Sequence, residues 1–261
     1  MTAPPRVAIV TGGSGGLAPG IARVLLEKGY AVVLVARDEA RLRRTADALK
    51  DITAAPVDAV ACDVTQATSV RAMVTGVLER FGRIDLLVNA AASSNPIGGA
   101  IEEIDVDALI GDLDTKVGGY LRCIRAVAPA MKQQGHGRIV NIGGLTGRSS
   151  DTLSGLRNVA VSHLTKVMAD QLGPFGITVN AVHPGITRTP HLDELFAEMA
   201  REKGTTGTAV EADFISQIPT RRLVLPEDIG ETIAFLGGGR GDAVNGESIT
   251  VDGGYSRGIY L

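Results

Sequence analysis

Aromatic residues are scarce in this chain. Phe, Trp and Tyr together make up 3% of its 261 residues, and Trp is absent. Proteins that bind single-stranded nucleic acid stack bases on aromatic side chains, so this composition speaks against that class. Basic residues are not in excess either, because 26 Lys and Arg face 29 Asp and Glu and the net charge is −3. No basic footprint therefore invites a phosphate backbone or an anionic lipid surface.

Cysteines are few, and long apolar runs are missing. Cys62 and Cys123 lie far apart, which makes neither a disulfide framework nor a metal-ligand pattern. No apolar run approaches the roughly 20 residues that a membrane-spanning helix needs. Residues 1–5 lead directly into an apolar strand, without the pattern of a signal peptide. We therefore expect a soluble cytoplasmic protein with no membrane, nucleic-acid or metal partner.

The chain does contain a regular alternation of two patterns. Short runs that are apolar on both sides are typical of buried strands, and amphipathic stretches typical of helices separate them. The expected strands are 6–10, 31–36, 57–62, 85–89, 138–142, 177–182 and 248–251, and the expected helices are 20–28, 38–50, 69–81, 107–133, 153–172 and 226–236. This order predicts an α/β fold with one doubly wound parallel sheet, a Rossmann fold, and helices on both of its faces.

No break in composition marks a second domain, so residues 1–261 are expected to form one Rossmann domain. Within it, residues 190–220 depart from the regular pattern, because a helical piece is followed by a Gly- and Thr-rich segment. Ligands of open α/β sheets sit beyond the carboxyl ends of the strands, and this stretch follows one of them. We interpret 190–220 as a substrate-covering flap, although a merely variable loop fits the same residues equally well.

A Gly-rich turn, TGGSGGLAPG at 11–20, follows the first expected strand and opens a helix. Small residues at such a turn let the backbone approach a pyrophosphate that faces the helix N-terminus. A Gly-rich turn alone is weak evidence. Its position at the start of a βαβ unit makes a dinucleotide site the better interpretation.

The end of the second strand bears on the choice of nucleotide. An acidic side chain at position 36 would bind the ribose 2′-hydroxyl of NAD, but Ala36 has none. Arg37 can instead pair with a 2′-phosphate, which favours NADP(H) over NAD(H). Asp63, at the end of the third strand, is placed to accept from an adenine amino group. In the alternative, Arg37 is a solvated residue at the start of a helix and Asp63 is an ordinary aspartate at the end of a strand. Neither would then bind a nucleotide.

Several motifs in a fixed order make the chain resemble the short-chain dehydrogenase/reductase family over nearly its whole length. They are the Gly-rich turn, CDVT at 62–65, LLVNAA at 86–91, GRIVNI at 137–142, GITVNAVHPGITRTP at 176–190, PEDI at 226–229 and VDGG at 251–254. The resemblance implies an NAD(P)-binding fold, hydride transfer to or from a small molecule, and a homotetramer or homodimer. One subunit interface would then involve the helices at 107–133 and 153–172.

The resemblance also assigns roles to residues of the nucleotide site. Those that would line the phosphates are Gly12, Ser14, Gly16 and Leu17. Asp63 and Val64 would flank the adenine, and Asn89 and Ala90 would contact the adenosine ribose side. Ile186 and Thr189 would hold the nicotinamide carboxamide.

The usual catalytic residues of that family do not carry over to this chain. The family uses a Tyr as proton donor, a Lys four residues later, a Ser after the fifth strand and an Asn on the preceding long helix. Counting along the matched motifs puts Ser154 at the Tyr position and Asn158 at the Lys position. The Ser position falls on Gly143 or Gly144, and residues 141–172 contain no Tyr. Because a Ser hydroxyl is a poor general acid, we predict an atypical proton donor.

One exchange suggests where that donor lies. Lys116 stands where the family has Asn, and Asn158 stands where it has Lys. We predict that Lys116 reaches the nicotinamide ribose or the substrate oxygen, with Asn158 hydrogen-bonded beside it. In the alternative, Lys116 and Asp112 form a solvated i,i+4 pair. The predicted catalytic set is therefore Lys116, Ser154 and Asn158.

A separate possibility concerns Arg157, which with Ser154 would hold an anionic group of the substrate, unless Arg157 is simply solvated or ion-paired.

Three functions fit this sequence. The first is an NADP(H)-dependent reductase of a C=O, C=N or conjugated C=C bond with an unusual proton donor. The second is a non-redox dehydratase, isomerase or cyclase on the same scaffold, and the third is a catalytically silent NADP(H)-binding protein. Because a fold does not fix a function, the choice depends on the site. The retained ITRTP segment at 186–190 favours the first, since it serves an ordered nicotinamide in the family.

Overall fold

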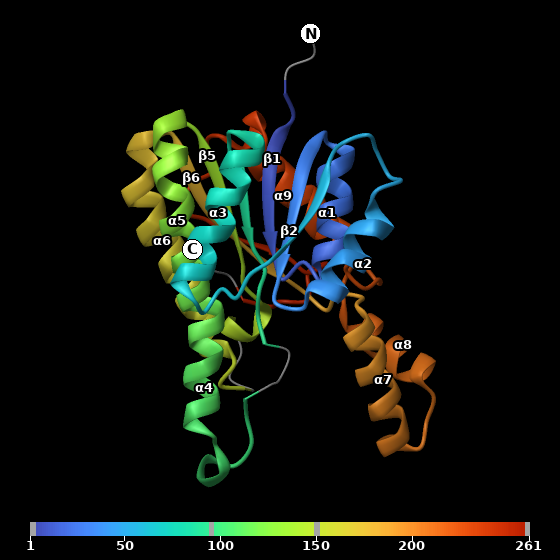
Figure 1. Cartoon of the computed structure of the whole chain (residues 1–261). Helices are drawn as coiled ribbons and strands as arrows, with labels where there is room; N and C mark the ends of the chain where they lie inside the picture. The colour runs from blue at the N-terminus through green and yellow to red at the C-terminus, as the bar shows by residue number, and fades with distance from the viewer. Residues whose placement is uncertain (1–3, 94–96, 149–151, 259–261) are drawn as a thin grey trace.

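The computed structural model describes residues 4–93, 97–148 and 152–258. Seven parallel strands form one sheet in the order β3-β2-β1-β4-β5-β6-β7 (Figure 1). The strands are β1 (Arg6–Thr11), β2 (Tyr30–Ala36), β3 (Val57–Ala61), β4 (Leu86–Asn89), β5 (Gly137–Ile142), β6 (Ile177–Pro184) and β7 (Ser248–Val251). The order reverses between β1 and β4, so helices cover both faces and the expected doubly wound sheet is confirmed.

The α-helices lie close to their expected positions. They are α1 (Ala18–Glu27), α2 (Glu39–Leu49), α3 (Ala67–Phe81), α4 (Val106–Leu113), α5 (Gly119–Gln134), α6 (Gly155–Leu172), α7 (Pro190–Lys203), α8 (Gly207–Gln217) and α9 (Pro226–Gly237). Figure 1 shows α3, α5 and α6 on one side of the sheet and α1, α2 and α9 on the other. Within the described part of the chain, none of these helices is both long and apolar enough to cross a membrane.

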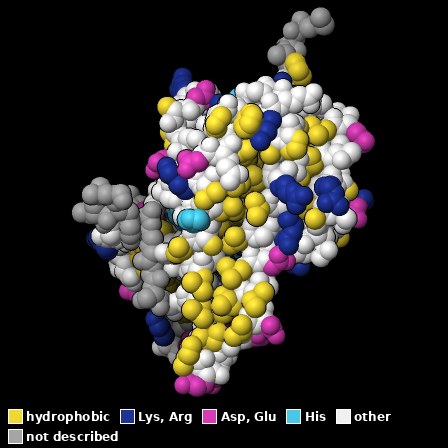
Figure 2. Space-filling view, turned by 90° about the vertical axis from the view of Figure 1, so that its left-hand side faces the viewer, with side chains coloured by type: hydrophobic (Ala, Val, Ile, Leu, Met, Phe, Trp, Pro, Cys, Tyr) yellow, Lys and Arg dark blue, Asp and Glu magenta, His cyan; other side chains and the backbone are white. Residues whose placement is uncertain are grey.

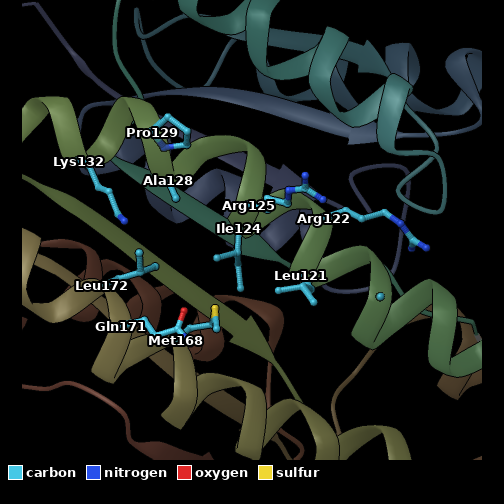
Figure 3. A pocket seen from close by; sticks show the side chains of 11 residues that line it. Leu121, Arg122, Ile124, Arg125, Ala128, Pro129, Lys132, Met168, Gln171 and Leu172 are labelled. Carbon is cyan, nitrogen blue, oxygen red and sulfur yellow. The ribbon is translucent and has the colours of Figure 1, made fainter.

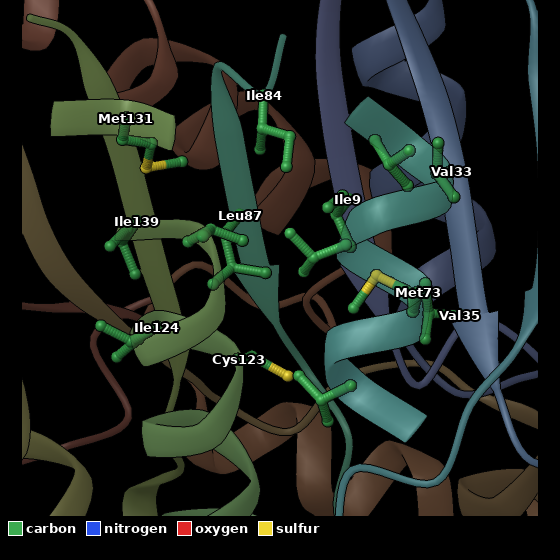
Figure 4. Packing of buried hydrophobic residues seen from close by; sticks show 14 of the residues in the cluster. Ile9, Val33, Val35, Met73, Ile84, Leu87, Cys123, Ile124, Met131 and Ile139 are labelled. Atoms are coloured by element: carbon green, nitrogen blue, oxygen red, sulfur yellow. The ribbon is translucent and has the colours of Figure 1, made fainter. Parts of the chain in front are cut away.

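Two apolar cores fill the spaces between the sheet and the two helical layers. Ile9, Leu87 and Ile139 point toward α3 and α5, where Cys123 and Met131 meet them (Figure 4). The residues next to them on the strands point the other way, toward α1, α2 and α9. This arrangement explains why the strands are apolar on both sides, as a sheet buried on both faces requires.

The long helical pattern that begins at 107 is interrupted in its middle. Between α4 and α5, residues Asp114–Gly118 form a π-helical turn, called the π turn below. A π turn adds a residue to the helical ladder and often marks a functional position. Here it contains the buried Lys116.

Residues 190–217 form two helices, whereas the sequence predicted only one helical piece. Phe196 of α7 and Phe214 of α8 pack with ring centroids 5.2 Å apart. Val210 and Ile218 complete a small apolar cluster of their own. The helices α7 and α8 extend beyond the carboxyl ends of the strands (Figure 1). The interpretation of this segment as a substrate-covering flap stays a prediction.

The contact of α1 with α9 depends on the lack of a side chain at Gly20. A Cβ atom at this position would overlap the Pro226 ring. We expect Gly20→Ala to lower the free energy of unfolding by about 1–3 kcal/mol, the usual cost of overpacking. Gly76→Ala is the matched control, because Gly76 lies inside α3 with open space around it. That substitution should stabilise by about 0.5–1 kcal/mol. Denaturant unfolding of both variants tests the contact, and equal effects would contradict it.

Candidate active site

A cavity of about 770 Å³ lies at the carboxyl ends of β5, β6 and β7. Ligands of open parallel sheets bind at this edge because the loops after the strands converge there. The wall combines the π turn, the loop after β5, the first turn of α6, the loop after β6, the end of α8 and the segment after β7. Its residues are Lys116, Gly143, Gly144, Leu145, Thr146, Arg157, Asn158, Pro184, Gly185, Ile186, Gln217, Tyr255, Ser256 and Arg257.

Lys116 is the central polar group of this wall. The π turn directs its side chain inward, where only 4% of the residue is exposed. Its Nζ donates to Asn158 Oδ1 at 2.8 Å and to the Gly143 carbonyl oxygen at 3.0 Å. Asn158 Nδ2 in turn donates to Thr146 Oγ1 at 2.7 Å. The structure therefore contains the predicted hydrogen bond between Lys116 and Asn158. Because Lys116 is buried, it does not form a solvated pair with Asp112.

The surroundings of Lys116 change its acidity. Burial and, to a smaller extent, the positive charge of Arg157 lower the pKa of Lys116, Asp112 opposes both, and together they bring the pKa to about 7. An ammonium taken out of water loses hydration, so its charged form becomes less stable. A lysine with such a pKa exchanges its proton near neutral pH, as a general acid or base must.

A buried ion pair stands beside Lys116. Arg157 Nη1 donates to Asp112 Oδ1 and, at 3.2 Å, to the Ser93 carbonyl oxygen. The Asp112 side chain is 3% exposed and that of Arg157 is 14% exposed. The pair joins α4, which leads into the π turn with Lys116, to α6, which carries Asn158. Arg157 is therefore ion-paired, as one of the two interpretations from the sequence has it, and it also lines the cavity.

Ser154, the third predicted catalytic residue, lies elsewhere. Its Oγ accepts a hydrogen bond from the Ile97 backbone N–H at 3.0 Å, and the residue is buried outside the cavity wall. The hydroxyl therefore anchors the chain around Ile97. A catalytic role for Ser154 stays a prediction with no geometric support from the cavity.

Sequence reasoning missed several residues of the wall, among them Thr146, Tyr255 and Arg257. Thr146 follows the end of β5 by four residues and receives the amide of Asn158. Tyr255 and Arg257 follow β7 within the segment that ends the described chain. Their signal was their position, because the residues after each parallel strand gather at the same edge.

The Gly-rich turn after β1 fits a pyrophosphate. Gly12 has a φ of +73°, and a Cβ there would lie 2.8 Å from the Ala90 carbonyl oxygen. Gly16 has a φ of +62° and no atom within 4 Å of such a Cβ, so the turn is open on that side. Leu17 precedes α1 without capping it by a side chain. Ligand oxygens can therefore approach the first amides of α1.

The other end of the predicted nucleotide site is basic. Burial alone would raise the pKa of Asp63, but hydrogen bonds from Thr65 and the charges of Arg37 and Arg122 lower it overall. Arg37 is exposed, and its positive charge lies close enough to Asp63 to lower the pKa of that carboxyl. Arg41 was missed by sequence reasoning, and its Nη2 lies 3.5 Å from the Ser14 carbonyl oxygen. The sequence signal that could have found Arg41 is its spacing, because it is a second arginine four residues after Arg37.

The other predicted nucleotide residues are placed as follows. Asn89 is fully buried and donates to Asn141 Oδ1 at 2.9 Å, so its side chain faces the core and only its backbone is left for a ribose. Ala90 N–H is held by Thr11 Oγ1. Val64 is buried at the end of β3. Ile186 lines the cavity, whereas the Thr189 hydroxyl caps α7 by accepting from Leu192 N–H.

Comparison with known proteins now identifies the family. A family model described as enoyl-(acyl carrier protein) reductase matches residues 12–256. The short-chain reductase protein NovJ of Streptomyces niveus is 35% identical over 259 residues, which cover 95% of this chain and 93% of that protein. The chain belongs to the short-chain dehydrogenase/reductase family. It is therefore an oxidoreductase of the short-chain reductase/dehydrogenase type.

Solved structures agree with this family. L-Sorbose reductase from Gluconobacter frateurii, complexed with NADPH and L-sorbose, matches with a TM-score of 0.92 and 27% identity, covering 99% of both chains. NAD⁺-bound xylitol dehydrogenase matches with a TM-score of 0.86 and 26% identity, covering 95% of this chain and 98% of that one.

In this short-chain oxidoreductase, the positions assigned to the family's Ser have no room for one. A Cβ at Gly143 would overlap the His183 ring, and a Cβ at Gly144 would lie 2.8 Å from Asn158 Nδ2. Thr146, which follows them in the same loop, brings a hydroxyl to the wall, and that hydroxyl contacts Asn158.

The buried Lys116 should make stability depend on pH. Between about pH 7 and the ordinary lysine value of 10.5, the folded protein has released a proton that the unfolded chain retains. Because the unfolded state then binds more protons, stability rises with pH, by up to about 1.4 kcal/mol per pH unit. We expect the free energy of unfolding of the wild type, relative to Lys116→Met, to increase from about pH 7 to about pH 9.

Denaturant unfolding at several pH values measures this difference. Lys50→Met is the control, because Lys50 lies exposed at the end of α2. Its difference from the wild type should stay constant. A constant difference for Lys116→Met as well would show that Lys116 does not lose its proton on folding.

Proposed function

We propose that this protein is an NADP(H)-dependent reductase of a C=O, C=N or conjugated C=C bond in which Lys116 is the proton donor. The observation that carries the proposal is the buried Nζ of Lys116 in the cavity wall. An ammonium has three N–H donors. The protein accepts two of them, at Asn158 Oδ1 and at the Gly143 carbonyl oxygen. The third is left for a substrate atom in the cavity.

Bound NADPH would supply a hydride to the substrate carbon. The protein's part is to hold the reacting groups and to deliver a proton to the oxygen, the nitrogen or the far carbon of the reduced bond. Lys116 would give that proton, and its acceptors Asn158 and Gly143 fix the direction of the ammonium. Thr146 Oγ1 accepts from Asn158, so its own O–H is a second donor toward the cavity. Neutral Lys116 then regains a proton from water entering the open cavity.

Two arginines support NADP(H) as the nucleotide. Arg37 follows β2, which ends on the non-acidic Ala36, and Arg41 lies against the Gly-rich turn. Guanidinium groups bind phosphate oxygens through paired N–H donors. The solved relatives include both an NADPH complex and an NAD⁺ complex. We therefore expect Arg37 and Arg41 to determine which of the two nucleotides this chain binds.

We also propose that the protein assembles as a homodimer or homotetramer through α5 and α6. A groove of about 640 Å³ runs between these helices (Figure 3). Its apolar lining includes Leu121, Ile124, Ala128, Met168 and Leu172. The space-filling view shows apolar side chains gathered on this side of the molecule (Figure 2). Such a patch on a protein surface is typical of an interface between subunits.

Arg37→Ala tests the nucleotide. We expect the variant to bind NADPH about tenfold or more weakly and NADH unchanged, because a hydrogen bond between charged groups contributes about 1.5–3 kcal/mol. Titration calorimetry with each nucleotide measures both constants. Arg43→Ala, an exposed residue of α2 paired with Glu39, should change neither. Equal losses for both nucleotides would refute the role of Arg37 in recognising the 2′-phosphate.

Lys116→Met tests the chemistry. NADPH oxidation is followed by absorbance with the first ketone, imine or enone found in a screen. In the wild type, kcat/KM for reduction should be constant below about pH 7 and fall above it, because only the ammonium donates. The variant should lose about 10²–10⁴-fold and show no such fall.

Tyr255→Phe is the competing variant, since Tyr255 brings a phenolic O–H donor to the same wall. It should keep the fall near pH 7. If Tyr255→Phe removes activity while Lys116→Met retains both rate and pH profile, Lys116 is not the donor.

A further inference from the structure

The charge of the cavity wall is one-sided. Among the described residues that line it, Lys116, Arg157 and Arg257 carry positive groups and none is an Asp or Glu. The nearest acidic groups lie behind the wall. Asp112 faces Arg157, and Asp252 accepts from the backbone N–H groups of Gly254 and Ser256. Among the described residues, a ligand in the cavity therefore meets three cationic side chains, one of which, Arg157, is already paired with Asp112.

The two arginines come from different elements. Arg157 belongs to the first turn of α6 and is held rigidly by Asp112. Both of its hydrogen bonds use Nη1, and Nε has no partner among the described residues. Arg257 follows β7, is exposed, and donates from Nη2 to the Gln217 carbonyl oxygen at 3.3 Å. A guanidinium has five N–H donors, so each side chain keeps donors that the protein does not use.

The phosphates of a bound nucleotide would not use these cations. The pyrophosphate is assigned above to the Gly-rich turn, and the 2′-phosphate to Arg37 and Arg41. None of these residues lines the cavity, whereas Ile186, expected at the nicotinamide, does. Arg157 and Arg257 are thus left facing the space where the substrate would lie.

We propose that the substrate of this enzyme carries an anionic group, a carboxylate or a phosphate, that Arg157 and Arg257 bind while its reducible bond faces Lys116. The inference rests on the proposed reductase function and names its substrate class. Planar guanidinium groups bind carboxylate and phosphate oxygens in pairs, which fixes orientation as well as charge. The anion would also stabilise the charged form of Lys116, because a nearby opposite charge favours an ammonium.

The experiment compares matched pairs of compounds that differ only in the anion. The probes are 4-oxopentanoate against its methyl ester, and dihydroxyacetone phosphate against dihydroxyacetone. Binding to the protein saturated with NADP⁺ is measured by calorimetry, so no turnover is needed. We expect the anionic member of at least one pair to bind about tenfold or more tightly. The pair that discriminates distinguishes a carboxylate from a phosphate.

Two variants connect that preference to the arginines. Arg257→Gln should reduce the ratio of anion to neutral affinity about tenfold, and Arg240→Gln, an exposed arginine elsewhere, should leave the ratio unchanged. Arg157→Gln alone would leave Asp112 buried and uncompensated and risks unfolding. The double variant Asp112→Asn with Arg157→Gln avoids that charge and should also reduce the ratio. Equal binding within both pairs, or a ratio that survives both changes, would overturn the proposal.

The result separates this inference from the reductase function. Selective binding of an anionic probe without NADPH oxidation for any anionic substrate would keep the anion site and refute the reductase. NADPH oxidation with neutral ketones, without a preference for either anion, would keep the reductase and refute the anion site. If NADP⁺ does not bind, the same calorimetry on the protein alone decides the anion site.

Discussion

The burial of one ammonium group organises this active site. Lys116 has almost no contact with water, so its Nζ must find oxygen acceptors within the protein or lose its proton. Asn158 and the Gly143 carbonyl supply those acceptors, and Thr146 holds the other end of the Asn158 amide. One cation thus ties together the π turn, the loop after β5 and α6, which are far apart along the chain.

Charged groups act at two separate places in this molecule, the ends of β2 and β3 and the cavity. At the ends of β2 and β3, the exposed Arg37 lies within electrostatic reach of Asp63, in a part of the site where solvent weakens each interaction. In the cavity, the Asp112–Arg157 pair and Lys116 are largely buried, so charges act on one another over short distances with less screening. The first place suits recognition of a flexible phosphate, and the second suits control of a proton.

Most of the fold could be predicted because the strand and helix periods are strong in this sequence. The helix α8 was missed, since it packs mainly against α7 through Val210 and Phe214 and has little apolar surface to reveal it. The contact of Lys116 with Asn158 could be inferred by counting along the family resemblance, which predicted that these two residues lie side by side. Ser154 could not be placed this way. Its hydroxyl binds Ile97, a residue 57 positions away, and nothing in the local sequence indicates that partner.

The close packing around Gly143 and Gly144 sets an order on how this site can change over evolutionary time. A serine at 144 would press against the Asn158 amide, and one at 143 would strike His183. A lysine at 158 would in turn place a second ammonium against Lys116, where Oδ1 of Asn158 now accepts. Each single step toward the more common arrangement of the family is therefore unfavourable while its neighbours stay as they are. Several residues would therefore have to change together for this site to hold a Ser at 143 or 144 and a Lys at 158.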